Sequence, residues 1–385
     1  MRQIKIILLC AATFAASLSA QTSPNDILES VRSRYAPDKR VAVWTLSSEL
    51  ASDSSVVVRG DVENRQAVAD IAAAFASAGY TFRDSITVLP DETVAKPWAI
   101  VSISVACMRS RAASSAELVS QAIMGTPMRV LKCEEGMSLV QTPDNYLGYM
   151  TDSSMTMLSD EEFAQWRSSK RCVVTTYQAS LYAEAKADES NIVSDLLLGN
   201  ILKFVEKKGK FIKVELPDGR QGYVKKADVS DFDEWTNRKF DINTIERNAR
   251  RMMGSPYLWG GMSSKMADCS GFVKTAYFSN GIILQRDASQ QVHTGGKIDW
   301  HDWAQKAQKG DLIFIGTKSG RVTHVAMYLD KGKYIHSSGR VKINSMDSNA
   351  EDFLDYTFIS MSRINGYVGT KGITAVKSHP WYIKD

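Results

Sequence analysis

Two stretches of this chain carry the same order of strands and turns. Residues 118–150 read LVSQAIMGTPMRVLKCEEGMSLVQTPDNYLGYM, and residues 192–224 read IVSDLLLGNILKFVEKKGKFIKVELPDGRQGYV. Each stretch predicts a strand, a turn that contains glycine, two further strands, a Pro-Asp turn and a Gly-Tyr pair. Short strands at this spacing are typical of small β-barrels, and their recurrence indicates an internal duplication. The middle of the chain therefore predicts two small β-barrels.

The composition is that of an ordinary globular protein. The 385 residues are 44% hydrophobic and 23% charged, which argues against a largely disordered chain. A formal net charge of +4 is too close to neutral to indicate a nucleic-acid partner. Length alone predicts two or three domains.

Residues 1–20 have the pattern of a cleavable secretion signal. Arg2 and Lys5 precede an apolar run over 6–16, and small residues follow. The alternative interpretation is a first helix that is frayed or buried. The apolar run is too short to span a bilayer, so we expect no stable membrane insertion. The signal predicts an exported protein, periplasmic or extracellular, whose mature chain begins near Gln21.

Four cysteines follow the predicted signal: Cys107, Cys133, Cys172 and Cys269. In an oxidising compartment some of them could form disulfides, and their spacing does not indicate which. They form no CxxC pair and the five histidines are scattered, so a structural zinc site is poorly supported. We expect neither a metal ion nor an organic cofactor.

The sequence predicts an α+β protein with several domains behind the signal. Residues 21–108 combine strand and helix patterns without a candidate for chemistry, and we interpret them as a small N-terminal α+β domain. Residues 109–170 and 171–232 hold the two predicted barrels. A polar segment over 231–240 serves as a linker, and 241–385 form the C-terminal domain.

The stretch 254–272, GSPYLWGGMSSKMADCSGF, is the most informative part of the chain. Its Gly-Ser-Pro and Gly-Gly steps predict turns in which the backbone passes close to a site. The apolar residues from Phe272 onward share one helical face, so Cys269 is predicted to lie near the first turn of a helix. Peptide dipoles and free N–H groups at that end stabilise a thiolate, which makes the cysteine a better nucleophile near neutral pH.

A nucleophilic cysteine needs a base, and a predicted hairpin supplies two histidines. Residues 322–329 predict a strand that contains His324, and 334–337 predict a returning strand that contains His336. The two side chains share one face if the numbers of paired residues add up to an even sum, and lie on opposite faces if the sum is odd. On one face, His324 could accept the proton of Cys269, and His336 could orient His324.

Each of these residues alone also has a structural interpretation. A lone buried cysteine is commonly a small apolar core residue, and a lone histidine on a strand is more often structural than catalytic. We interpret His293, His301 and His379 as structural or exposed. The combination of a glycine-rich turn, an Asp-Cys-Ser-Gly step and two strand histidines favours catalysis.

Five motifs in the C-terminal domain occur in the order typical of a known family. They are GSPYLWGG, ADCSGF, KGDLIFIG, THVAMYL and YIHSSG. With these motifs, residues 241–370 resemble the NlpC-type cell-wall cysteine peptidases, papain-like enzymes that cut the stem peptides of peptidoglycan. The resemblance implies Cys269 as nucleophile, His324 as general base and His336 as the third, polarising residue. It also implies an oxyanion donor from the backbone near Cys269, with Tyr257 contributing its hydroxyl.

The predicted barrels resemble bacterial SH3-like domains, and this pairing narrows the resemblance. The combination of SH3-like domains with a peptidase-like domain is similar to the γ-D-glutamyl–L-diamino acid endopeptidases. In those enzymes an SH3-like domain abuts the cleft and helps to select a free N-terminal L-Ala. By position, Glu117 would meet the amine of the substrate, and Tyr149 would shape the end of the pocket. Equally, these two residues could be a solvated charge at the rim and an aromatic residue of the barrel core.

The resemblance further implies a set of residues that line the glutamyl side of the pocket: Asp268, Ser270, Arg286, Asp287 and Ser289. The family usually has proline before the arginine, and this chain has Gln285 there. The implied substrate is a stem peptide of the type L-Ala-γ-D-Glu-diamino acid, and the sequence leaves the diamino acid open. A free ammonium favours a carboxylate partner such as Glu117, and burial strengthens that preference.

Two other functions remain open from the sequence. The C-terminal domain could be an amidase or acyl transferase on the same papain-like scaffold, which would act on a different bond. Alternatively, the barrel pair could bind the cell wall while the C-terminal domain is inert.

Overall fold

The computed structural model describes residues 22–51, 53 and 55–384. The predicted secretion signal at 1–20 lies outside the described residues. In the part of the chain that is described, no helix is long and apolar enough to cross a membrane.

The chain divides into two compact units. Of the described residues, the first unit takes in 22–37 and those of Trp44–Thr87, and the second takes in Asp38–Val43 and 88–384. The short segment Asp38–Val43 therefore belongs to the second unit, although the sequence on either side of it belongs to the first.

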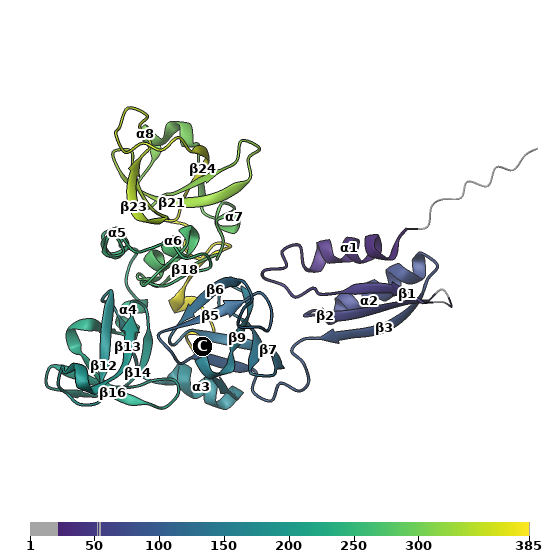
Figure 1. Cartoon of the computed structure of the whole chain (residues 1–385), viewed down its shortest axis with the longest axis horizontal. Coiled ribbons are helices and arrows are strands. Elements are labelled where there is room, and N and C mark those ends of the chain that lie inside the picture. The colour runs from purple at the N-terminus through teal and green to yellow at the C-terminus, as the bar shows by residue number, and fades with distance from the viewer. Residues whose placement is uncertain (1–21, 52, 54, 385) are drawn as a thin grey trace, which may run out of the picture. The chain divides into compact units, whose positions relative to one another are not determined.

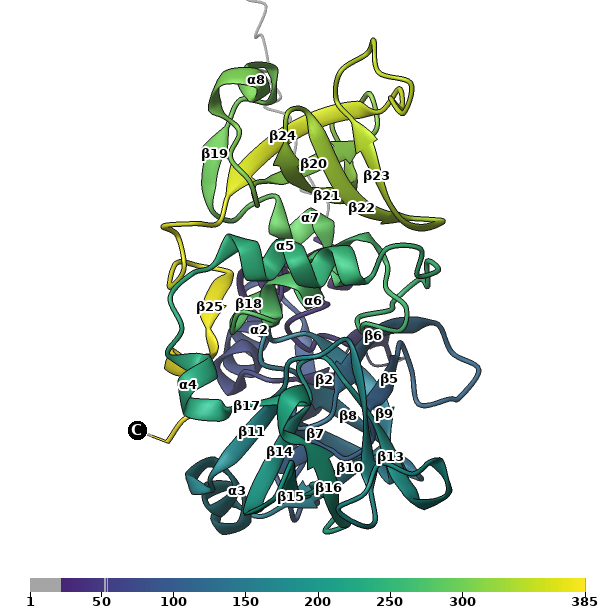
Figure 2. The ribbon, with the colours of Figure 1, turned by 90° about the vertical axis from the view of Figure 1, so that its left-hand side faces the viewer.

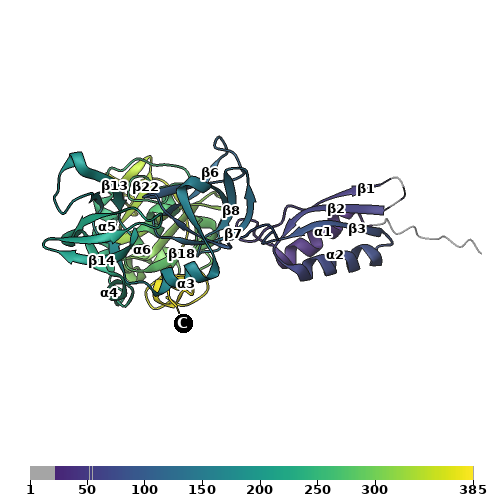
Figure 3. The same ribbon diagram turned by 90° about the horizontal axis from the view of Figure 1, so that it is seen from below.

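The first unit consists of two helices on one face of a three-stranded sheet (Figure 3). Its elements are α1 (Pro24–Tyr35), β1 (Ser47–Leu50), β2 (Ser55–Val62), α2 (Arg65–Ser77) and β3 (Thr81–Val88). Asn64 caps α2 by accepting a hydrogen bond from the backbone of Gln66. Phe75 on the buried face of α2 stacks on Phe82 of β3, so apolar side chains join helix and sheet.

The second unit begins with two seven-stranded sheets, which we call the first and second β-domains (Figure 1). The strands of the first β-domain are β4 (Trp98–Val101), β5 (Val105–Arg109), β6 (Leu118–Ile123), β7 (Pro127–Glu134), β8 (Met137–Gln141), β9 (Leu147–Thr151) and β10 (Met155–Leu158). Helix α3 (Asp160–Ser168) follows, with Ser159 and Glu162 forming its capping box. The strands of the second β-domain are β11 (Arg171–Val174), β12 (Gln178–Tyr182), β13 (Ile192–Leu197), β14 (Ile201–Lys208), β15 (Phe211–Glu215), β16 (Gln221–Lys225) and β17 (Val229–Asp231).

Both β-domains have the same strand order. The first sheet runs β10-β4-β7-β8-β9-β5-β6, and the second, read from its other edge, runs β17-β11-β14-β15-β16-β12-β13. The pairing of β7 with β8 has a bulge between Val130 and Lys132, and the pairing of β14 with β15 has one between Phe204 and Glu206. The repeat in the sequence therefore corresponds to a repeat in topology.

The domain boundary drawn from the sequence at 108/109 falls inside the first β-domain. Strand β4 pairs with β7 and β10, and nearly all of β5 also precedes residue 109. The composition of 98–109 predicts strands whether the stretch belongs to the N-terminal domain or to the first β-domain. The hydrogen-bonding partners of β4, however, lie tens of residues further along the chain. A local pattern does not identify such partners.

The C-terminal domain has a six-stranded sheet in the order β19-β24-β20-β21-β22-β23. The strands are β19 (Gly296–Ile298), β20 (Leu312–Gly316), β21 (Val322–Asp330), β22 (Lys333–Ser338), β23 (Arg340–Ser345) and β24 (Thr357–Arg363), and a separate pair is β18 (Ile282–Leu284) with β25 (Ile373–Ala375). The helices are α5 (Ile242–Arg251), α6 (Cys269–Phe278), α7 (Ala288–Gln291) and α8 (Trp303–Lys306). The short helix α4 (Phe232–Thr236) precedes them and contacts β11 and β17 of the second β-domain. Figure 2 shows α5 and α6 between this sheet and the two β-domains.

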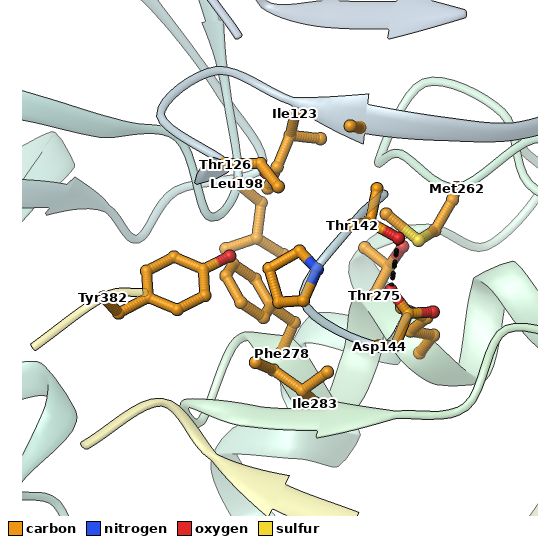
Figure 4. Close-up of a pocket in the computed structure, with 13 residues that line it drawn as sticks. Ile123, Thr126, Thr142, Asp144, Leu198, Met262, Thr275, Phe278, Ile283 and Tyr382 are labelled. Carbon is orange, nitrogen blue, oxygen red and sulfur yellow. Dashed lines mark hydrogen bonds and ion pairs between the residues drawn. The ribbon is translucent and has the colours of Figure 1, made fainter. Parts of the chain in front are cut away.

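The three modules of the second unit meet around a small cavity of about 40 Å³ (Figure 4). Its lining is mostly apolar and comes from all three modules: Ile123 and Thr126 of the first β-domain, Leu198 of the second, and Phe278, Ile283 and Tyr382 of the C-terminal domain. Beside it, Lys274 of α6 forms a buried ion pair with Asp144, and Thr142 donates to the same carboxylate at 2.8 Å. The backbone of Ile201 donates to Met124 at 3.0 Å, which joins the two β-domains.

Candidate active site

Cys269 is the first residue of α6, and Asp268 is the N-cap of that helix. The Asp268 carboxylate accepts hydrogen bonds from the backbone of Gly271 at 2.7 Å and of Gly260 at 3.0 Å. This side chain therefore ties the glycine-rich loop to the start of the helix. The prediction that Cys269 lies near a helix N-terminus is confirmed.

The glycine-rich loop comes very close to the first β-domain. Gly260 has φ of 74°, and a Cβ atom on it would lie 2.3 Å from the carbonyl oxygen of Leu118. A side chain does not fit at that distance, and the left-handed conformation also favours glycine. Glycine at this position therefore allows residues next to Leu118 to border the same cleft as Cys269.

The two strand histidines share one face of the hairpin. Met327 of β21 pairs with Ile335 of β22, so the numbers of paired residues add up to an even sum. His324 Nε2 lies 2.8 Å from His336 Nδ1, which is a hydrogen-bonding distance. The arrangement that places both imidazoles on one face is the one observed.

Cys269 contacts the strand that carries His324. Helix α6 packs against β21, and the backbone N–H of Val325 donates to the Cys269 thiol. The cysteine at the start of the helix and the histidine beside Val325 are thus neighbours across the helix–sheet interface, although they lie far apart in the sequence.

The pKa values of Cys269 and His324 are shifted away from those that a helix terminus would favour for a thiolate. Burial, and then the Asp268 carboxylate, raise the pKa of Cys269 to about 11. Burial, together with His336 and Lys342, lowers the pKa of His324 to about 3. At neutral pH the resting site therefore holds a neutral thiol and a neutral imidazole. Both shifts run against the expected thiolate, because the loss of water around the sulfur opposes the effect of the helix dipole.

Cys269 opens onto a cleft of about 650 Å³. The structure brings seven of the residues named from the sequence together in its lining: Glu117, Tyr257, Asp268, Cys269, Ser270, Asp287 and Ser289. It also adds residues that the sequence did not indicate, among them Arg40, Tyr146, Trp259 and Arg321.

Glu117 lies at the cleft on the first β-domain. Its Oε1 accepts a hydrogen bond from Trp259 Nε1 at 2.9 Å, and 65% of the Trp259 surface is exposed. Trp259 belongs to the glycine-rich loop, so this bond links the β-domain to the peptidase motif across the cleft. A carboxylate held in this way can receive a cation from the cleft side.

Tyr149 does not line the cleft, which corrects one assignment. Its hydroxyl donates to Glu134 at 3.0 Å, and its ring packs with the apolar cluster around Leu131 and Leu139. Tyr149 is half-buried on this cluster and is not part of the main apolar core of the β-domain. Tyr146, just before β9, lines the cleft instead, and its hydroxyl donates to Asp287 Oδ2 at 3.3 Å. Both tyrosines lie in NYLGYM, and only the path of the turn decides which one faces the cleft.

Arg286 is close to the site but lies beneath its surface. It is 1% exposed, and it donates to both oxygens of Asp268, to Ser270 and to Ser120 of the first β-domain. Burial opposes its charge, but Asp268 keeps the pKa of Arg286 above its usual range. Its donors are therefore used to hold Asp268 and the β-domain, and a direct contact with substrate, as implied by the resemblance, is not supported.

Arg40 reaches the cleft from the segment Asp38–Val43. Its Nη1 donates to Asp287 Oδ2 at 2.7 Å and to Ser289 Oγ at 2.9 Å, while Asp38 pairs with the rest of the guanidinium. No sequence pattern indicated this residue, because its partners lie more than two hundred positions further along the chain. Only the folded chain brings them together.

The described residues contain no group of three His, Cys, Asp or Glu side chains that could hold a metal ion. Cys107, Cys133, Cys172 and Cys269 are free thiols in the structure.

Comparisons with known proteins agree with this arrangement. Residues 254–360 match the NlpC/P60 family, and residues 108–155 match the bacterial dipeptidyl-peptidase Sh3 domain. The γ-D-glutamyl-L-lysine dipeptidyl-peptidase of Bacillus cereus is 28% identical over 236 residues, covering 57% of this chain and 67% of that protein. Dipeptidyl-peptidase 6 of Lysinibacillus sphaericus is 29% identical over 249 residues, covering 60% of this chain and 85% of that protein.

A solved structure shares the fold. The crystal structure of an NlpC/P60 family protein from Bacillus cereus covers 69% of this chain and 99% of its own, with a TM-score of 0.60 and 23% sequence identity. The chain therefore carries a cysteine peptidase domain of the NlpC/P60 family at residues 254–360, preceded by an SH3 domain of the bacterial dipeptidyl-peptidase type at residues 108–155.

Proposed function

We propose that this protein is an exported cysteine endopeptidase that hydrolyses the γ-D-glutamyl–L-diamino acid bond of peptidoglycan stem peptides with a free N-terminal L-Ala. The observation that carries the proposal is the position of Cys269. It begins α6, contacts the strand of His324, and opens onto a cleft that Glu117 of the SH3 domain also lines. Two relatives named as dipeptidyl-peptidases, one of them for γ-D-glutamyl-L-lysine, support the substrate class. The signal pattern at 1–20 supports export.

The chemistry follows from the neutral resting pair. As Cys269 Sγ attacks the γ-carbonyl carbon of D-Glu, its proton moves to His324. The carbon–nitrogen bond then breaks, His324 returns the proton to the leaving amine of the diamino acid, and a thioester remains. His324 next takes a proton from water, which attacks the thioester and releases L-Ala-γ-D-Glu. The carbon–sulfur bond breaks in this step, and His324 returns the proton to Cys269 Sγ.

Tyr257 and the backbone at the start of α6 suit the negative charge that develops on the carbonyl oxygen. Burial, and after it the neighbouring Cys269 and Asp268, raise the pKa of Tyr257, so its hydroxyl stays protonated and able to donate. Tyr257 lines the same cleft as Cys269. We therefore assign it to the oxyanion.

The products of the reaction identify which bond of the stem peptide is hydrolysed. We expect the enzyme to convert L-Ala-γ-D-Glu-L-Lys, or its meso-diaminopimelate counterpart, into L-Ala-γ-D-Glu and the free diamino acid, as measured by mass spectrometry. The ratio of the two rates reports which diamino acid is accepted. Release of L-Ala from a muramyl group would instead indicate an amidase. Sedimentation with peptidoglycan without any cleavage would indicate a wall-binding module.

The preference for a free amine depends on Glu117. We expect N-acetylation of the tripeptide to lower kcat/KM of the wild type by on the order of 10²-fold, because it removes the ammonium that pairs with the carboxylate. In Glu117→Gln the free peptide should react more slowly, and acetylation should then change the rate by less than about 10-fold. Steady-state kinetics on both peptides measure the two ratios.

The matched control is Glu206→Gln, an exposed glutamate of the second β-domain, which should keep the wild-type ratio. If Glu117→Gln discriminated between the two peptides as strongly as the wild type, Glu117 would have no part in amine selection.

A further inference from the structure

Asn344 of β23 contacts His336, the second imidazole of the histidine pair. Its side chain is 7% exposed, and its Oδ1 lies 3.0 Å from His336 Nε2. Its Nδ2 donates to the backbone oxygen of Asp352 at 2.6 Å. This second bond determines the orientation of the amide, because only the nitrogen can donate to a carbonyl oxygen. Asn344 therefore presents an acceptor to His336.

An acceptor at that position determines where both imidazoles carry their protons. His336 Nε2 must hold a proton to bond the amide oxygen, so in the neutral ring Nδ1 is an acceptor. His324 Nε2 must then hold the proton that bonds His336 Nδ1. The remaining nitrogen, His324 Nδ1, is left without a proton and free to accept one.

The hydrogen bond between the two histidines does not by itself determine which nitrogen of each ring carries the proton. If His336 carried its proton on Nδ1, it would donate to His324 Nε2 over the same 2.8 Å, and the number of bonds between the two rings would be unchanged. His324 would then carry its proton on Nδ1 and have no free nitrogen for the thiol. The two arrangements differ at Asn344, which accepts in the first and faces a bare nitrogen in the second.

From this geometry we propose that Asn344 is a positioning residue, which sets the tautomers of His336 and His324 so that His324 Nδ1 is the base for Cys269. Asn344 acts through the two histidines. Asn344 is additional to the nucleophile, the base and the third residue that were named from the sequence. No sequence motif indicated it.

The other groups around the pair do not replace this acceptor. Lys342 from the same strand carries a positive charge near both rings and opposes their protonation. Tyr334 from β22 and Tyr356 before β24 place aromatic rings against His336, and Cys269 lies on the α6 side. The Asp352 carboxylate is paired with Lys333, so only its backbone oxygen serves Asn344.

The tautomers can be measured directly, without any substrate. In protein labelled with ¹⁵N-histidine, long-range ¹H–¹⁵N correlation spectra distinguish the protonated nitrogen of each ring. The chain has five histidines, so single replacements suffice for assignment. We expect Nε2–H on both His324 and His336 at neutral pH. A proton on Nδ1 of His336 would overturn the proposal, and this test does not depend on the proposed function.

Two variants then separate positioning from simple packing. Asn344→Leu keeps the size but removes the acceptor, so we expect mixed tautomers and a fall in kcat of about 10²-fold with little change in KM. Asn344→Asp keeps an acceptor for His336 but loses the donor to the Asp352 backbone oxygen, so it should retain the Nε2–H tautomers and more activity than Asn344→Leu. Its negative charge should raise the pKa of His336, which moves the acidic limb of the kcat/KM profile to higher pH.

The control is Asn248→Leu, a buried asparagine of α5 that bonds Arg251 and lies outside the cleft. It should leave the histidine spectra unchanged. If Asn344→Leu did not fold, the wild-type spectrum and the pH profile of Asn344→Asp would still decide the matter. Wild-type tautomers in Asn344→Leu, or equal losses of kcat in the Leu and Asp variants, would show that Asn344 is merely structural. Failure of the peptidase proposal would show differently, as a wild type that cleaves no stem peptide.

Discussion

Replacing Cys269 with alanine is expected to abolish hydrolysis of L-Ala-γ-D-Glu-L-Lys, with a fall in kcat of on the order of 10⁴-fold or more. The reason is that, in the mechanism we propose, the thioester forms on this sulfur, and no other described cysteine lines the cleft. Product release followed by mass spectrometry over long incubations measures the residual rate.

The matched control is Cys133→Ala, which removes an exposed thiol from β7 of the first β-domain. It should retain the full rate. If Cys269→Ala and the wild type cleaved the peptide equally, the assignment of the nucleophile would be rejected, and the cleft would have to act on its substrate in some other way.

Replacing Lys274 with methionine is expected to lower the free energy of unfolding by about 3–5 kcal/mol. Lys274 and Asp144 are both almost fully buried, with side-chain exposures of 8% and 6%, and they join α6 to the first β-domain. Burial lowers the pKa of Lys274 while Asp144 opposes that shift, as is typical of a cation held inside a protein by one partner. Without the lysine, the Asp144 carboxylate is left buried and unpaired. Urea unfolding followed by circular dichroism measures the difference.

Two further variants test this explanation. Arg250→Met breaks the ion pair between a half-exposed arginine and Glu246 on α5. Because Glu246 keeps its second ion pair with Lys309, the change should cost about 0.5 kcal/mol or less. The double variant Lys274→Met with Asp144→Leu removes both charges, and should recover much of the loss. If Lys274→Met were no more costly than Arg250→Met, the ion pair would not hold the modules together as described.

The cleft is a product of two modules rather than of the peptidase domain alone. Glu117 and Tyr146 come from the first β-domain, and Arg286 holds the two sides together by bonding both Asp268 and Ser120. Gly260 allows the backbones to approach closely enough for this to happen. Under the function proposed above, a pocket made in this way would couple substrate recognition by the SH3 domain to the position of Cys269.

Local patterns in the sequence were sufficient for several features. Asp268 before Cys269 and the apolar face that follows place the cysteine at a helix start, because caps and periodicity act within one or two turns. The turn between the strands of His324 and His336 is short, so hairpin pairing left only two arrangements to choose between. The repeated strand and turn signals indicated the two β-domains in the same way.

Contacts between distant residues decided the rest. Whether Tyr146 or Tyr149 faces the cleft depends on the turn at the start of β9, and Arg40 meets Asp287 only because the segment Asp38–Val43 returns to the second unit. The neutral state of Cys269 reflects burial, which a sequence does not display. In short-range structure each residue's partners are set by its neighbours in the chain. Side-chain direction, desolvation and long-range hydrogen bonds depend on which surfaces meet on folding. The role inferred for Asn344 rests on contacts of this kind, and the sequence alone did not indicate it.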